Sequence, residues 1–396
     1  MAYPKSYRSI DIDGLSIFYR DAGPRDAPIV LLLHGFPSSS RMYEPLFARL
    51  ADRYRLIAPD YPGFGHSDAP DPSVFAYTFD HLAEVMDGFV RALGLERYSL
   101  FVQDYGGPVG FRLAVAHPER LQALIIQNAV AHEDGLGPLW ATRRAFWADR
   151  RTHEAALRDN FLSLAATRQR HLGRSPRPWA YDPDLWTDEF AFLSRPGQAD
   201  IQTDLFFDYR TNVTRYPAWQ AWLRDRRPGL LVLWGRYDPS FDVAEAQAYR
   251  RDVPDAEVHI LDAGHFALDD RRDCHPHGRF PGANRPANRL VVVLSVLVGR
   301  LQPSLSVRPL ISAGDSSPRR QRGRHEGGRR PHASHGWNRR RQLRPRTAAP
   351  VLPCVIHRLA SCPANHSFES ATRTRASGRP SSRRTILVPS TRATHL

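Results

Sequence analysis

The chain has 396 residues and a formal net charge of +14, and this basic excess is confined to its end. Residues 274–396 carry 23 arginines against three acidic residues, whereas residues 1–273 carry 32 basic and 38 acidic residues. The mildly acidic first part argues against a nucleic-acid-binding body, because such proteins hold phosphate groups through basic surfaces. All three cysteines lie after residue 273, so we expect neither a disulfide framework nor a cysteine metal site in residues 1–273.

Secretion and membrane insertion both depend on long apolar runs in the sequence. No charged and then apolar signal peptide opens it, and the longest apolar run, residues 290–298, is too short to span a bilayer. We therefore expect a cytoplasmic protein that does not contact a membrane.

The first hundred residues alternate between strand and helix patterns. Short strands are predicted at 6–10 and 15–19 around an Asp-Gly turn, and the continuous aliphatic run at 28–33 predicts a strand buried on both faces. A helix at 42–51, a strand at 55–60, a Gly/Pro turn cluster at 61–68 and a helix at 79–93 follow.

Residues 99–108 form the stretch around which the chain is organised. The apolar run 100–102 predicts a buried strand, which stops at a polar residue, turns on Gly106 and Gly107, and continues with helical spacing over 109–116. A strand, a sharp turn and a helix with one reactive side chain at the tip describe a nucleophile elbow. The side chain at the tip is Asp104, where serine is usual.

The remaining elements divide the chain into segments. A strand at 123–127 completes a first core segment, 1–132, and residues 133–215 carry aromatic residues on helix-like segments, which predicts a helical cap. A strand at 230–235, a helix at 243–251 and a strand at 257–262 form a second core segment, 216–273. The predicted fold class is α/β, with a mostly parallel sheet and flanking helices.

Residues 274–396 follow a different pattern, rich in Arg, Pro, Ser, His and Gly without hydrophobic period, which predicts a largely disordered tail. Lys5 is the single lysine of the chain, and this composition is what GC-rich coding sequence yields in a wrong frame, so we interpret the tail as a frameshift product. The alternative is an arginine-rich arm that contacts nucleic acid.

Three polar residues, Asp104, Asp238 and His265, each follow a predicted strand. Single Asp or His residues at strand ends are usually turn residues, but carboxyl ends of parallel strands meet at one edge of a sheet, where ligands bind. An aspartate nucleophile suits a saturated carbon, because it leaves an ester that water can cleave, whereas serine would leave an ether.

The motifs together resemble a known family. His34-Gly35-Phe36-Pro37, Val102-Gln103-Asp104-Tyr105-Gly106-Gly107, Trp234-Gly235-Arg236-Tyr237-Asp238 and Gly264-His265-Phe266 resemble the α/β-hydrolase superfamily, and more narrowly its haloalkane dehalogenase and epoxide hydrolase branch. The resemblance implies the α/β-hydrolase fold, with Asp104 as nucleophile, His265 as general base and Asp238 as its partner. It also implies an oxyanion hole from the backbone N–H groups of Phe36 and Tyr105, and no cofactor or metal.

The two branches differ at the leaving group. Dehalogenases hold the halide with a Trp after the nucleophile and an Asn or Trp elsewhere; this chain has Tyr105 and Phe36 there, so Trp140 or Trp147 would substitute. Epoxide hydrolases protonate the ring with cap tyrosines, for which Tyr209 and Tyr181 are candidates. We expect a dehalogenase-like hydrolase acting on a small apolar substrate with water; the alternatives are an epoxide hydrolase and a copy impaired by its aberrant end.

Overall fold

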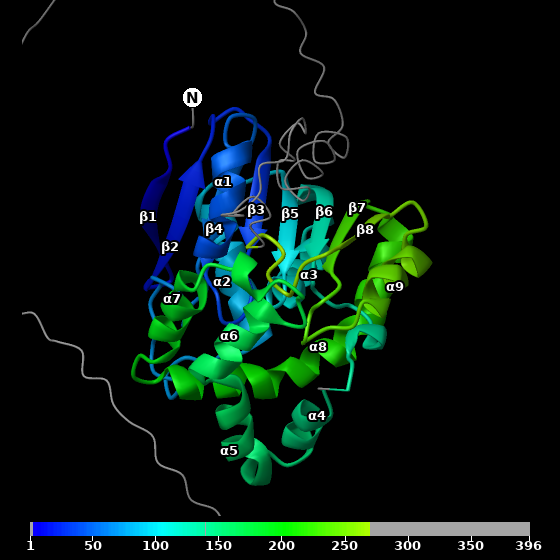
Figure 1. Ribbon diagram of the computed structural model, residues 1–396. Helices are drawn as coiled ribbons and strands as arrows, with labels where there is room; N and C mark the ends of the chain where they lie inside the picture. Colours follow the sequence, from blue (N-terminus) through cyan, green and yellow to red (C-terminus); the bar gives the residue numbers. More distant parts are fainter. Residues whose placement is uncertain (1–2, 139, 270–396) are drawn as a thin grey trace, which may run out of the picture. The chain divides into compact units, whose positions relative to one another are not determined.

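The structure is a computed structural model that describes residues 3–138 and 140–269 (Figure 1). The predictions for residues 274–396, namely the disordered tail, the frameshift, the nucleic-acid-binding arm and the loss of a last core helix, lie outside the described residues.

One sheet of eight strands organises the described residues. Strands β1 and β2 run antiparallel to their neighbours, and the remaining strands are parallel. This confirms the predicted mostly parallel α/β sheet. Across the sheet the order is β1 (Ser6–Ile12), β2 (Leu15–Ala22), β4 (Arg55–Pro59), β3 (Ile29–Leu33), β5 (Tyr98–Gln103), β6 (Leu121–Gln127), β7 (Gly229–Gly235) and β8 (Glu257–Leu261).

Helices flank the sheet and fall close to the predicted positions. Helix α2, for example, begins after Thr78, whose hydroxyl accepts a hydrogen bond from the His81 N–H and so caps the first turn. The core helices are α1 (Glu44–Leu50), α2 (Phe79–Ala92), α3 (Gly106–Ala116) and α9 (Ala244–Asp252). Short 3₁₀ turns lie at η1 (Ser40–Tyr43), η2 (Pro118–Arg120), η3 (Glu133–Gly135) and η4 (Pro178–Ala180).

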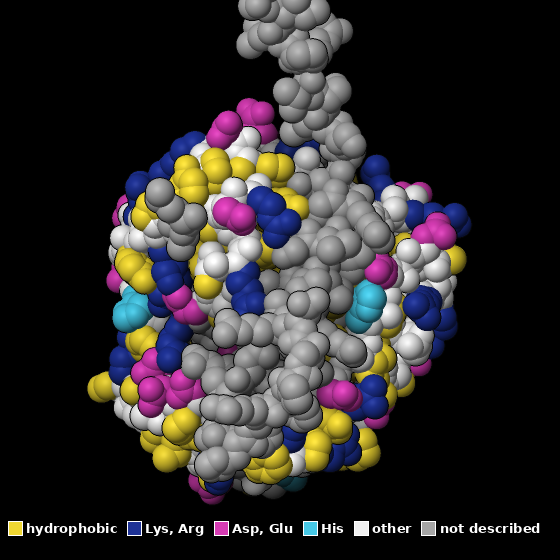
Figure 2. Space-filling view, turned by 45° about the horizontal axis from the view of Figure 1, so that its top comes forward, with side chains coloured by type: hydrophobic (Ala, Val, Ile, Leu, Met, Phe, Trp, Pro, Cys, Tyr) yellow, Lys and Arg dark blue, Asp and Glu magenta, His cyan; other side chains and the backbone are white. Residues whose placement is uncertain are grey.

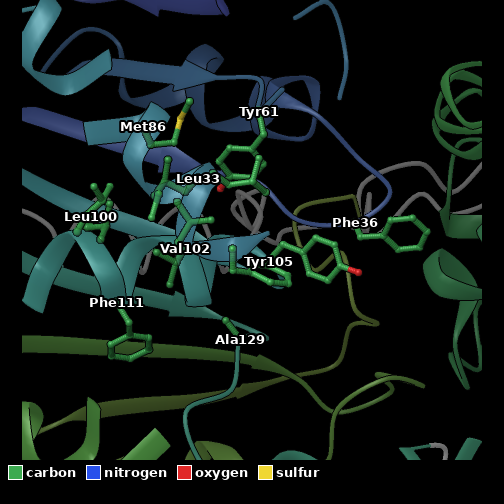
Figure 3. Packing of buried hydrophobic residues seen from close by; sticks show 14 of the residues in the cluster. Leu33, Phe36, Tyr61, Met86, Leu100, Val102, Tyr105, Phe111 and Ala129 are labelled. Carbon is green, nitrogen blue, oxygen red and sulfur yellow. The ribbon is translucent and has the colours of Figure 1, made fainter. Parts of the chain in front are cut away.

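The strand residues alternate between two apolar clusters, one on each face of the sheet. In β3, Leu31 and Leu33 belong to the cluster that contains Met86 of α2, whereas Leu32 packs in the cluster that contains Leu46 of α1. Figure 3 shows part of the first cluster. Burial on both faces explains why the central strands read as continuous aliphatic runs.

Five helices follow β6 in the segment that the sequence predicts to be a cap, and we call them the cap helices. They are α4 (Trp140–Ala148), α5 (Arg150–Phe161), α6 (Leu164–Leu172), α7 (Asp184–Leu193) and α8 (Gln198–Arg226). They gather at one end of the sheet, in the lower half of Figure 1. Helix α8 continues through Pro217, so the predicted cap boundary at 215 falls inside one unbroken helix.

Charged side chains of both signs are interspersed over the face shown in Figure 2, as the near balance of acidic and basic residues in 1–273 leads one to expect. Among residues 3–138 and 140–269, no helix is both long and apolar enough to cross a bilayer.

Candidate active site

Asp104 stands at the turn between β5 and α3, as the elbow pattern predicts. Its φ of +47° lies in the left-handed region, which is a strained conformation for a residue with a side chain. The turn is tight because Gly106 passes the end of β3: a Cβ there would lie 2.0 Å from the Leu33 carbonyl oxygen. This tight turn projects the Asp104 carboxylate beyond the edge of the sheet.

The two oxygens of the Asp104 carboxylate have different surroundings. Oδ1 accepts hydrogen bonds from the backbone N–H groups of Phe36 (2.9 Å) and Tyr105 (2.7 Å). Oδ2 lies 3.6 Å from Nε2 of His265. Burial raises the pKa of the Asp104 carboxyl, while the imidazole and the two N–H donors oppose this rise.

His265 and Asp238 form a buried pair, with Nδ1 of the imidazole 2.8 Å from Oδ2 of the carboxylate. The other oxygen, Oδ1, accepts from the backbone N–H groups of Ser240 (2.6 Å) and Phe241 (3.1 Å). Burial by itself would lower the pKa of His265, but the carboxylates of Asp238 and Asp104 together more than offset this and raise it above its usual 6.5. The structure thus brings the three residues singled out from the sequence into one constellation.

Two further polar residues complete this constellation, and the sequence analysis gave neither a role. Asn128 donates through Nδ2 to Oδ2 of Asp238 (2.7 Å) and accepts from the Gly235 N–H (2.9 Å). Nε2 of Gln103 lies 2.9 Å from Nε2 of His265. Gln103 is the last residue of β5, and Asn128 directly follows β6, so each places an amide at the end of an apolar run. A polar amide at the end of such a run is the sequence feature from which a role could have been predicted.

A small cavity adjoins Asp104 and His265. Its lining combines aromatic rings with two guanidinium groups, and consists of Phe36, Asp104, Tyr105, Trp140, Arg143, Arg170, Phe206, Tyr209, Ser240, Phe241 and His265. The rings of Phe36 and Tyr105 lie beside each other, with centroids 5.8 Å apart (Figure 3).

Tyr105 and Tyr209 line this cavity from the core and from the cap. Both hydroxyls are buried; that of Tyr105 has no hydrogen-bond partner among the described residues, whereas that of Tyr209 interacts with the hydroxyl of Tyr216. Burial raises the pKa of each well above the usual value near 10, so both hydroxyls keep their protons at neutral pH.

The other predicted leaving-group residues are placed differently. Trp140 lines the cavity, but its indole N–H donates to the Ser240 carbonyl (2.8 Å). Trp147 stays out of the lining, and its N–H donates to the Phe206 carbonyl (2.7 Å). Tyr181 is also outside it, with its hydroxyl accepting from the Gly264 N–H (3.1 Å). Trp147 and Tyr181 thus lie outside the lining of this cavity, and their contact with the substrate stays a prediction.

Arg143 of α4 and Arg170 of α6 were also missed from the sequence. Arg143 lies three residues from both Trp140 and Phe146, and Arg170 three residues from Thr167, so each stands on the buried face of its helix, a spacing that could have found them. Within the described residues, no group of three or more His, Cys, Asp or Glu side chains is arranged to hold a metal ion.

Comparison with known proteins places the chain in a family. Residues 28–271 match the family model described as the alpha/beta hydrolase fold. The chain belongs to the α/β-hydrolase fold family. The resemblance inferred from the motifs is thus confirmed, and the protein is an α/β-fold hydrolase.

Individual relatives and a solved structure show which kinds of hydrolase this chain resembles. An uncharacterized hydrolase of Saccharomyces cerevisiae is 40% identical over 262 residues, which cover 65% of this chain and 89% of the relative. Haloalkane dehalogenase 2 of Mycobacterium tuberculosis is 40% identical over 126 residues, 32% of this chain and 43% of that protein. The solved structure of an epoxide hydrolase has a TM-score of 0.57 at 17% identity and covers 76% of this chain and all of its own, which shows a shared fold.

Proposed function

We propose that this hydrolase works through a covalent ester on Asp104. The proposal rests on the different surroundings of the two carboxylate oxygens. Oδ1 is held by the N–H groups of Phe36 and Tyr105, while Oδ2 lies at the cavity and 3.6 Å from the His265 imidazole. In the first step Oδ2 attacks a saturated carbon of the substrate, a C–O bond forms, and the leaving group departs.

Water cleaves the ester in the second step. Nε2 of His265 takes a proton from a water molecule, and the oxygen of that water attacks Cγ of Asp104. Negative charge then develops on Oδ1, where the N–H groups of Phe36 and Tyr105 already point. When the tetrahedral species collapses, the imidazolium of His265 returns its proton to the alkyl oxygen, which leaves as the alcohol. The carboxyl so formed loses its proton, to the tyrosinate after epoxide opening or to solvent after loss of a halide, and the carboxylate is restored. Asp238 stabilises the imidazolium while it carries the proton.

For the leaving group we propose an epoxide oxygen. Ring opening needs a proton donor, and the hydroxyls of Tyr105 and Tyr209 are protonated and buried; that of Tyr105 has no partner in the described residues, and that of Tyr209 interacts with Tyr216. A halide needs N–H donors; the indole N–H groups of Trp140 and Trp147 are both used by backbone carbonyls, which leaves the guanidinium groups of two arginines in the cavity lining for that role. These contacts favour the epoxide over the dehalogenase-like reading of the sequence.

A haloalkane is the second candidate. It is favoured by the 40% identity of a 126-residue segment to a haloalkane dehalogenase. In that reaction the halide leaves without a proton, so the tyrosine hydroxyls would only solvate it.

A His265→Ala variant of the full chain separates these outcomes. Without the base, the ester should form on Asp104 and persist, so we would incubate the variant with an epoxide and a bromoalkane of equal chain length and record the intact mass. An added hydroxyalkyl group supports epoxide opening, and an added alkyl group supports dehalogenation. Peptide mapping should place either group on Asp104.

The control is the double variant Asp104→Asn/His265→Ala, which should gain no mass from either compound. An adduct that persists in this double variant, or one that maps to another residue, would overturn the assignment of Asp104.

A further inference from the structure

Two cap arginines lie in the cavity wall without a carboxylate partner. Arg143 and Arg170 are 7% and 6% exposed, and neither forms an ion pair among the described residues. Arg20 and Arg55, each 8% exposed, are buried to a similar extent, but each has a carboxylate partner. Arg20 pairs with Glu44 at 2.9 Å, and Arg55 pairs with Asp21 at 3.0 Å. Since a buried charge is costly without a counter-charge, the two cavity arginines differ from the rest in lacking one.

Aromatic rings fix both guanidinium groups in place. The Cζ atom of Arg143 lies 4.4 Å from the ring centroid of Trp140 and 4.3 Å from that of Phe161. Arg170 stands 4.5 Å from the Phe36 ring centroid, and its Nη2 donates to the Phe161 carbonyl (2.7 Å). These contacts orient the guanidinium planes, but Nη1 of each arginine is buried and has no acceptor in the described residues.

Both side chains stay cationic at neutral pH. Burial lowers the pKa of each, and that of Arg170 falls to about 10, with the nearby charge of Arg143 contributing to the fall. Asp104 and, for Arg170, Glu189 are nearby negative charges, but neither carboxylate lies within ion-pair distance of the two guanidinium groups, so they offset these positive charges only in part. Once Asp104 is esterified its negative charge is lost, so the arginines then need another anion.

We propose that Arg143 and Arg170 bind a carboxylate carried by the substrate. Two planar guanidinium forks suit the two oxygens of a carboxylate, whereas a halide ion offers a single centre. The substrate class is then a small carboxylic acid whose reactive carbon lies within reach of Asp104. This substrate class rests on the proposed function, although the binding site itself does not. A carboxylic acid of this kind would take the place of the small apolar substrate expected from the sequence.

The test uses ligands that cannot react. Butanoate and butanamide have the same shape and differ in charge, so we would titrate each into the full-length protein by calorimetry. We expect butanoate to bind at least about tenfold more tightly than butanamide. Arg143→Gln and Arg170→Gln should each weaken butanoate binding by about tenfold or more and leave butanamide binding unchanged.

Matched controls come from the same two helices. Arg144 of α4 and Arg168 of α6 are exposed, so Arg144→Gln and Arg168→Gln remove the same charge without reaching the cavity and should leave butanoate affinity unchanged. If a cavity variant fails to fold, Arg143→Lys and the comparison of the two ligands on the unmodified chain still decide the question.

Three results would overturn the proposal. They are equal affinity for butanoate and butanamide, a preference for butanoate that survives both cavity substitutions, and arginine-dependent binding of chloride that matches that of butanoate. Because the probes lack a leaving group, Asp104→Asn should still bind butanoate. A failed adduct experiment with intact butanoate binding would therefore contradict the nucleophile assignment and not the carboxylate site.

Discussion

Asp238 owes its orientation to a neighbour from another strand end. Asn128 donates to the same carboxylate oxygen that faces His265, and it has a φ of +43°. Asn128→Gly tests this positioning role, because glycine tolerates that backbone conformation while the amide is removed. Loss of a hydrogen bond to a charged group should slow ester hydrolysis by about 10- to 100-fold.

Rapid-quench kinetics with mass detection would measure that effect. The ester should form at the normal rate in Asn128→Gly and then accumulate. Slower formation with normal hydrolysis would instead place the effect of Asn128 on Asp104.

The pH dependence of hydrolysis also belongs to the residue scale. His265 must be neutral to take a proton from water. Burial lowers its pKa and the carboxylates of Asp238 and Asp104 raise it, but only Asp238 keeps its charge once Asp104 is esterified. The rate of ester breakdown should therefore rise with pH, with a midpoint at the pKa of His265 in the ester. Single-turnover decay of the ester across a pH series measures this midpoint, and a rate that falls over the same range would exclude His265 as the base.

At the scale of elements, the close approach of α3 to β3 sets the geometry of the elbow. A Cβ on Gly106 would meet the Leu33 carbonyl oxygen at 2.0 Å, so Gly106→Ala must push the start of α3 away from the sheet. We expect a loss of about 1–3 kcal/mol in the free energy of unfolding, together with reduced activity, because the Tyr105 N–H moves with the helix.

Gly137→Ala provides the comparison, since a Cβ at that position has its nearest neighbours at 3.9 Å. Urea unfolding of the two variants should show destabilisation in Gly106→Ala alone. Equal stability of both variants would mean that the elbow relaxes without cost.

At the scale of the whole described molecule, a buried histidine joins the cap to the core. His171 of α6 lies 2.7 Å from Glu189 of α7 and 3.2 Å from Asp269, which follows β8. Burial would lower the pKa of His171, but the two carboxylates raise it to about 9. The stabilisation that this shift represents is therefore complete below about pH 6.5 and is lost as the pH rises through about 9.

His171→Gln should consequently cost on the order of 3 kcal/mol in the free energy of unfolding near pH 6 and much less near pH 10. Denaturant titrations of both proteins at the two pH values measure the difference. The double variant His171→Gln/Glu189→Gln controls for repulsion between the two remaining carboxylates. A cost that does not change with pH would show that His171 acts through packing alone.

The sequence by itself determined the element order and the main site. Aliphatic runs such as 28–33 mark strands buried on both faces. Asp104 and Asp238 follow such strands and His265 follows the half-buried β8, so local pattern and parallel topology suffice to bring the three to one edge. The strand and helix predictions at 55–60, 79–93 and 230–235 agree with β4, α2 and β7 to within a residue.

Tertiary structure alone decided what faces the cavity from the cap. Arg143 and Arg144 are adjacent on a polar helix, yet one is buried against Trp140 and Phe161 and the other is exposed. Likewise Trp147 is kept from the cavity by a hydrogen bond to the Phe206 carbonyl. The physical reason is that helical spacing places Arg143 on the face of Trp140 and Phe146, but whether a long charged side chain on that face is buried or reaches solvent depends on how the helix packs on its neighbours.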